Sequence, residues 1–154
     1  LVLGIALAAS PLAAALAIRP GALADAPALW WLAGMVTLWV AGFDVVYAMQ
    51  DIDFDRGRGL RSIPARLGVR GAAWASRALH LGAVGCLLLA GRAEPRLGAL
   101  YWVGVGGVVA LLLAEHAIVA LRRRPGLEAV YFTLNGVVSC VLGTAGVLDV
   151  VLAG

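Results

Sequence analysis

The residues best suited to chemistry lie in one short segment, residues 44–59, which reads DVVYAMQDIDFDRGRG. It follows 18 residues without a charged side chain, 26–43, and it contains four aspartates and two arginines. We expect the preceding helix to continue through residue 55. Such a helix aligns four side chains in one stripe, at i, i+3, i+7 and i+11: Asp44, Tyr47, Asp51 and Asp55.

Asp51 and Asp55 are one helical turn apart, and like charges at that spacing repel each other unless a cation lies between them. Mg²⁺ prefers oxygen ligands and commonly binds one or two protein carboxylates together with substrate phosphates. The pair therefore predicts a Mg²⁺ site. Asp44 lies deeper in the apolar segment, where an unpaired carboxylate is costly, so it should face a wet cavity or a partner. The alternative is a solvated acidic surface loop, which explains Asp53 but not Asp44.

Arginines follow the aspartates directly, at Arg56, Arg58 and Arg61. A guanidinium group binds phosphate oxygens through paired hydrogen bonds, and a metal beside it neutralises the same phosphate. The intervening Gly57 and Gly59 are expected to end the helix in a turn. Together, the acidic pair and these arginines favour a metal–phosphate site.

The chain as a whole has the composition of a membrane protein. Its 154 residues are 62% hydrophobic and 14% charged, with a mean hydropathy of +0.95, which is too apolar for a soluble domain of this length. Five apolar spans are each near the roughly 20 residues that cross about 30 Å of hydrocarbon. They cover residues 1–18, 28–48, 72–90, 97–121 and 128–152. We expect an all-α, polytopic transmembrane helix bundle that forms a single domain, residues 1–154.

Arginines concentrate on one side of this bundle. The loop 49–70 carries five and the segment 122–124 carries three, whereas the opposite side has only Arg19, Arg92 and Arg96. Because arginine-rich loops stay in the cytoplasm, we expect the Asp/Arg-rich loop 49–70 to be cytoplasmic. These arginines flank apolar spans, so the net charge of +3 does not indicate a nucleic-acid partner.

A few polar residues lie inside the spans. Glu115 and Asn135 lie at similar depth, which predicts a hydrogen bond between them, and a role in lining a pocket stays open as the alternative. His80 and Arg77 lie near the cytoplasmic end of their span. We expect their side chains, and that of His116, to reach toward the membrane surface.

Residues 47–68, YAMQDIDFDRGRGLRSIPARLG, resemble the second aspartate-rich motif of the UbiA superfamily of membrane prenyltransferases. In that motif a D-x-x-x-D pair is followed by a basic-Ser segment, here Arg61-Ser62, and by a Leu-Gly ending. Four further segments resemble the 4-hydroxybenzoate or menaquinone-pathway branch of the superfamily: 39–48, 100–104, 115–116 and 131–139.

The resemblance implies a nine-helix bundle in which the five spans correspond to the last five helices. It also implies transfer of a polyprenyl group from a polyprenyl diphosphate to an aromatic acceptor such as 4-hydroxybenzoate, in quinone biosynthesis, with Mg²⁺ as cofactor. The implied location is the bacterial inner membrane. No N-D-x-x-D-type first motif occurs in residues 1–154, so we expect N-terminal helices of the same parent chain to be missing and this fragment alone to be inactive.

The same resemblance assigns roles to individual residues. Asp51 and Asp55 ligate Mg²⁺, and Arg61, Arg56 and Ser62 contact the diphosphate. The catalytic set includes Asp44, whose role stays open between orienting Tyr47 or Gln50, lining the acceptor pocket and stabilising a cation. Four residues are expected in the acceptor pocket or just behind it: Tyr47, Gln50, Glu115 and Asn135.

Three alternatives remain beside this reading. One is a menaquinone-pathway prenyltransferase with a different acceptor. A CDP-alcohol phosphotransferase requires a D-G pair ahead of its aspartates, which this sequence lacks. A transporter places its carboxylates at the membrane midplane on broken helices, whereas these carboxylates gather at one helix end. The acceptor and the prenyl chain length stay open.

Overall fold

A computed structural model describes residues 2–120 and 127–153, without the side chains of residues 127–135 and 138. Every regular element in that part of the chain is a helix, which confirms the all-α prediction. The elements are α1 (Val2–Ile18), α2 (Ala22–Asp25), α3 (Pro27–Ala48), α4 (Ile52–Gly57), α5 (Ile63–Ala93), α6 (Ala99–Ala120) and α7 (Leu127–Leu152).

Each of the five apolar spans corresponds to one helix of the structure: α1, α3, α5, α6 or α7. Within the described residues, α3, α5 and α6 are long and apolar enough to cross a membrane. Two shorter apolar helical stretches accompany them, α1 and Ser139–Leu152 of α7. These lengths and compositions agree with a membrane helix bundle.

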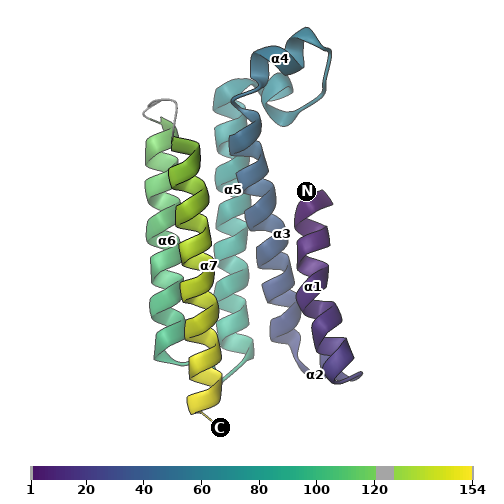
Figure 1. Cartoon of the computed structure of the whole chain (residues 1–154), viewed down its shortest axis with the longest axis vertical. Coiled ribbons are helices and arrows are strands. Elements are labelled where there is room, and N and C mark those ends of the chain that lie inside the picture. The colour runs from purple at the N-terminus through teal and green to yellow at the C-terminus, as the bar shows by residue number, and fades with distance from the viewer. Residues whose placement is uncertain (1, 121–126, 154) are drawn as a thin grey trace.

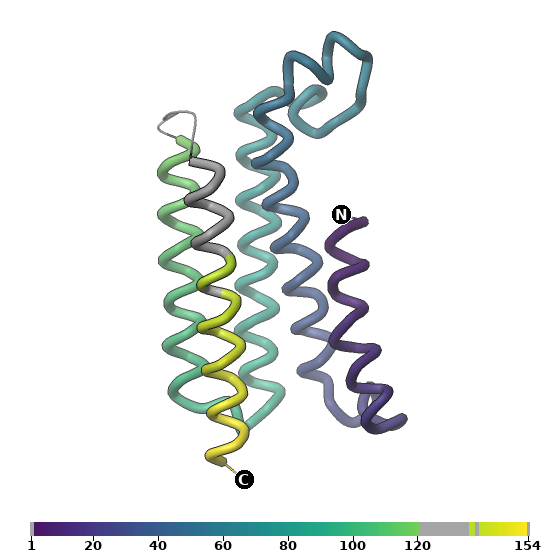
Figure 2. The backbone as a smooth tube through the Cα atoms, in the orientation of Figure 1, coloured from purple at the N-terminus to yellow at the C-terminus, as the bar shows by residue number. Residues whose placement is uncertain are grey.

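The long helices stand side by side in alternating directions (Figure 1). α3 packs between α1 and α5, and α6 packs against α5 and α7. Figure 2 shows the same order along the backbone, with α4 and the chain that follows it at one end of the bundle. The C-terminal end of α6 lies at this same end (Figure 1), as the arrangement of the spans predicts. We call it the loop end.

The core lies where α3, α5, α6 and α7 meet. On α6 its residues follow helical spacing, at Tyr101, Val105, Val108 and Leu112. Small residues permit the closest helix contacts: a Cβ on Gly4 would lie 2.6 Å from the carbonyl oxygen of Thr37. Such close backbone approach is typical of helix packing in membranes, where hydrophobicity alone gives no preference for protein over lipid.

Polar contacts fix the opposite end of the bundle. Between α5 and α6, Arg96 donates from Nε and Nη2 to the carboxylate of Glu94 at 2.8 and 2.9 Å, and this bonding holds the pKa of Glu94 below its usual value. At the start of α6, the Tyr101 N–H donates to the Asp149 carboxylate of α7 at 2.6 Å. The Tyr101 hydroxyl donates to the carbonyl oxygen of Leu87 on α5, at 2.8 Å. Three helices are thus joined near Tyr101.

Replacing Asp149 by alanine should lower the free energy of unfolding by about 1 kcal/mol, because it leaves a first-turn N–H of α6 without its acceptor. Thermal unfolding of the purified protein in detergent measures the change. Asp149→Asn is the matched control, since its amide oxygen can still accept the bond. Equal stability of Asp149→Ala and wild type would contradict this capping role.

Candidate functional site

The aspartate pair lies where the chain leaves α3. The N–H groups of Met49 and Gln50 donate to the carbonyl oxygens three residues earlier, at 3.2 and 3.0 Å, and α3 ends at Ala48. α4 begins at Ile52, after Asp51, whose φ and ψ are −96° and 12°. The prediction of one continuous helix through residue 55 is therefore wrong.

The interruption has a physical reason. None of the six residues of α4 is buried in the described structure, so no buried side chain holds the chain in line with α3 beyond the bundle. α4 instead lies across the loop end (Figure 1). Asp44 and Tyr47 stay on α3, half-buried, and are not in helical register with the other two aspartates.

Asp51 and Asp55 are nevertheless brought together. The Asp55 N–H donates to the carbonyl oxygen of Asp51 at 2.8 Å, which places the two residues one turn apart as predicted. Asp51 is exposed and Asp55 is half-buried. In the part of the chain that the structure describes, no ion pair links either carboxylate to an arginine. Both carboxylates are therefore available to a cation.

Two carboxylates one turn apart suit Mg²⁺, which takes hard oxygen ligands and leaves positions for phosphate oxygens and water. Among the described residues, no group of three or more His, Cys, Asp or Glu side chains is placed to hold a metal ion. The magnesium site at Asp51 and Asp55 therefore stays a prediction.

The segment after α4 folds back on itself. Gly59 has a φ of +68°, a left-handed conformation that glycine adopts without strain, and the Leu60 N–H donates to the carbonyl oxygen of Asp55 at 2.8 Å. The Arg56 Nε donates to the carbonyl oxygen of Ala65 at 3.2 Å. α4 does end at Gly57, as the glycines predict.

Ser62 has a structural role in this fold. Its hydroxyl oxygen accepts a hydrogen bond from the Ala65 N–H at 3.2 Å and so caps the start of α5. The next turn is kinked at Gly68, where φ is +68°. Arg61 is exposed beside the cap, and the Arg58 guanidinium lies 5.2 Å from the centre of the Phe54 ring. Arg61 and Arg58 thus stay on the surface near the aspartate pair.

The residues expected near the acceptor are spread over several elements. The Tyr47 ring lies 5.2 Å from that of Phe43 on the same helix, and Gln50 is exposed in the turn after α3. Glu115 on α6 is only 3% exposed, and neither of its carboxylate oxygens has a hydrogen-bond partner among the described side chains. Asn135 lies outside those side chains, so the Glu115–Asn135 hydrogen bond stays a prediction.

The structure reveals one polar contact that the sequence reasoning missed. The Nδ1 atom of His80 on α5 lies 3.0 Å from the Nε2 atom of His116 on α6, in hydrogen-bonding contact. His80 is 2% exposed, so its predicted reach toward the membrane surface is wrong. A Cβ on Gly42 of α3 would collide with the His80 ring, so the glycine leaves the space that the ring occupies.

A signal for this contact was present in the sequence. His80 continues a stripe of small and apolar residues, Ala72, Ser76, Ala83 and Leu87, all buried in the structure. A histidine in such a stripe points into the bundle and needs a polar partner there.

Comparison with known proteins agrees with this architecture. The model of the UbiA prenyltransferase family matches residues 1–137, and the chain belongs to that family. The chain is 32% identical over 126 residues to the 4-hydroxybenzoate octaprenyltransferase of Shewanella pealeana, which covers 81% of this chain and 42% of that protein. It is 30% identical over 108 residues to the enzyme of the same name from Shewanella denitrificans. That match covers 70% of this chain and 36% of the relative.

A relative from Pseudomonas savastanoi pv. phaseolicola has the same name and is 38% identical over 86 residues, covering 53% of this chain and 27% of that protein. The chain spans less than half the length of these curated relatives. No solved structure matches the chain.

Proposed function

We propose that the full-length protein containing this chain transfers a polyprenyl group from a polyprenyl diphosphate to an aromatic acceptor such as 4-hydroxybenzoate. The observation that carries the proposal is the aspartate pair, Asp51 and Asp55, one turn apart and beside surface arginines in a chain of the UbiA family. The named relatives support the acceptor class. The proposal includes the helices of the same parent chain that would complete the bundle.

The reaction breaks the bond between the first prenyl carbon and a diphosphate oxygen, and it forms a carbon–carbon bond to the acceptor ring. The ring then loses a proton, and diphosphate is released. The protein must stabilise the negative charge that gathers on the diphosphate as its bond breaks.

Asp51 and Asp55 would hold Mg²⁺, which when bound neutralises charge on the diphosphate. Arg61 is exposed next to the pair, so its guanidinium group would bind phosphate oxygens directly. Arg56 already donates to Ala65, so it would also brace the loop around the diphosphate. Ser62, as the cap of α5, would fix the position of Arg61.

In this proposal the acceptor ring lies next to the first prenyl carbon, on the side away from the diphosphate. Tyr47 and Asp44 are half-buried on the last turns of α3, close in sequence to the pair, and would border the acceptor. The loop end would face the cytoplasm of the bacterium, because arginine-rich loops remain on that side.

The test is product formation by the full-length protein in membranes. Radiolabelled polyprenyl diphosphate, 4-hydroxybenzoate and Mg²⁺ are expected to give a lipid-extractable aromatic product, and EDTA is expected to abolish it. Excess Mg²⁺ added after EDTA should restore the product. A product that forms equally well in EDTA would contradict the metal, and consumption of the diphosphate without transfer to any aromatic acid would contradict the acceptor class.

A further inference from the structure

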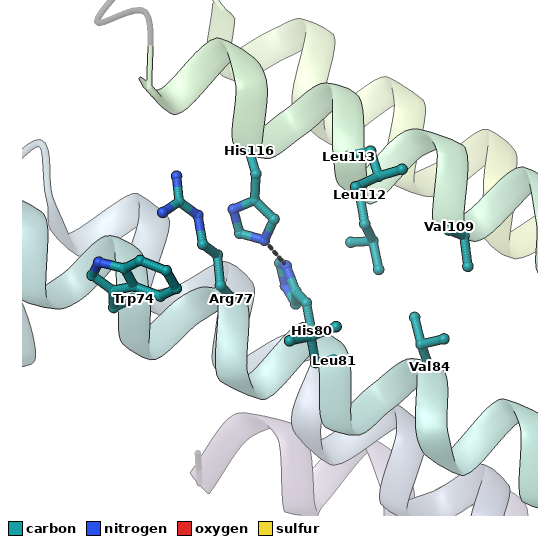
Figure 3. A pocket seen from close by; sticks show the side chains of 9 residues that line it. All are labelled: Trp74, Arg77, His80, Leu81, Val84, Val109, Leu112, Leu113 and His116. Carbon is teal, nitrogen blue, oxygen red and sulfur yellow. Dashed lines mark hydrogen bonds between the residues drawn. The ribbon is translucent and has the colours of Figure 1, made fainter.

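A groove of about 280 Å³ lies between α5 and α6, outside the proposed prenyl-transfer site (Figure 3). His80 and Leu112, which are 2% and 5% exposed, form its floor. Its rims include Trp74, Leu81 and Leu113, which are 69%, 72% and 67% exposed. Within this chain the groove is therefore open along both rims.

Polarity changes along the length of the groove. On α5 its wall runs from Trp74 and Arg77 to Leu81 and Val84, at i, i+3, i+7 and i+10. Arg70 lies one turn before Trp74 on the same face and is exposed. On α6, Val109 and Leu113 line the aliphatic part, and His116 lies at the end where Arg77 lies (Figure 3). Because α5 starts at the loop end, the cationic part is the part nearer the membrane surface.

Among the described residues, the two arginines have no anionic partner. The Arg77 guanidinium lies 5.0 Å from the centre of the Trp74 ring, and neither Arg70 nor Arg77 forms an ion pair within residues 2–120 and 127–153. A tryptophan and two arginines near the loop end of α5, next to an aliphatic cleft, match the shape and charge of an anionic lipid.

We propose that this groove binds an anionic phospholipid of the surrounding bilayer. Its phosphate contacts Arg70 and Arg77 beside Trp74, and one acyl chain lies along Leu81, Val84, Val109 and Leu113. The proposal does not rest on the prenyl-transfer reaction, because none of these residues belongs to the aspartate pair or its arginines.

The test uses the full-length protein, purified in a neutral detergent and titrated with phosphatidylglycerol or with phosphatidylcholine of the same acyl chains. Bound lipid is counted by native mass spectrometry. Each arginine should contribute about fivefold to the affinity for the anionic lipid. Arg77→Gln should therefore weaken phosphatidylglycerol binding about fivefold, and the double variant with Arg70→Gln should bind both lipids alike.

Two further variants separate a specific site from general attraction. Arg92→Gln removes an exposed arginine at the opposite end of α5 and should leave binding unchanged. Val84→Phe fills the aliphatic part and should weaken the binding of both lipids without changing the preference for phosphatidylglycerol. Circular dichroism of each variant confirms that the helices are intact.

Three results would overturn the proposal. Wild-type protein could bind the two lipids equally, or Arg92→Gln could weaken binding as much as Arg77→Gln. In the third, polyprenyl diphosphate displaces phosphatidylglycerol one for one, and Arg77→Gln weakens the binding of both ligands equally. The groove would then be a binding site for the prenyl donor. Prenyl transfer is assayed separately, so its outcome is independent of these results.

Discussion

Asp51→Asn and Asp55→Asn should each reduce prenyl transfer by the full-length protein by about 100-fold or more. Each substitution keeps the size of the side chain but removes one of the two negative charges that lie one turn apart at the loop end. Losing a group that stabilises developing charge commonly lowers the rate by about 10²–10³-fold. The initial rate of labelled product formation, measured across a range of Mg²⁺ concentrations, tests the prediction.

The neighbouring aspartate provides the control. Asp53 lies on α4 between the pair in sequence and is exposed, so Asp53→Asn makes the same chemical change at the same depth. We expect it to retain wild-type activity and the wild-type response to Mg²⁺. If all three variants lose activity equally, the general negative charge of the loop matters rather than a metal site. If none does, the acidic segment is a surface loop.

Gly42→Ala should destabilise the bundle by about 1–3 kcal/mol, the usual cost of adding a methyl group to a filled interior. The new Cβ on α3 would collide with the His80 ring, which is almost fully buried and bonded to His116 on α6. The ring must shift, and the bond between α5 and α6 should weaken with it. Thermal unfolding in detergent measures the loss.

A second variant tests whether the collision with the ring is the cause. His80→Ala removes the ring, so adding Gly42→Ala to it should cost far less than in the wild type, a non-additivity typical of residues in contact. Gly85→Ala is the matched control, because a Cβ there would meet nothing within 4 Å. An equal cost of Gly42→Ala in both backgrounds would contradict the role of His80.

Hydropathy located the membrane helices well where a helix is apolar throughout. The predicted span 28–48 is α3 to within one residue at its start, and the span 97–121 is α6 to within two. The span 72–90 fell short of α5 because the first turns of that helix contain Arg66 and Arg70. They begin with the Ser62 cap and contain the kink at Gly68, local features that an average over many residues does not register.

The sequence predicts the candidate site only where the interactions join residues close together in the chain. The spacing of Asp51 and Asp55 depends on one backbone hydrogen bond between neighbours in sequence, and it was predicted correctly. The break between α3 and α4 lies where the chain leaves the bundle and buries none of the α4 residues, and no repeat in the sequence encodes that change. The contact between His80 and His116 depends on how α5 meets α6, and on the space that Gly42 leaves on a third helix.

The segment α4 is joined to the bundle at both ends but buries none of its own residues. A metal–diphosphate complex bound to Asp51 and Asp55 would therefore have to bear the entropy cost of fixing any backbone residue of α4 that moves in the empty enzyme, about 1–2 kcal/mol for each. Part of the binding energy of the polyprenyl diphosphate would offset this cost. The measured affinity for the diphosphate would then be weaker than its contacts with the protein alone would give. After transfer, the product-bound enzyme could release diphosphate quickly, because loosening α4 exposes no buried residue of its own.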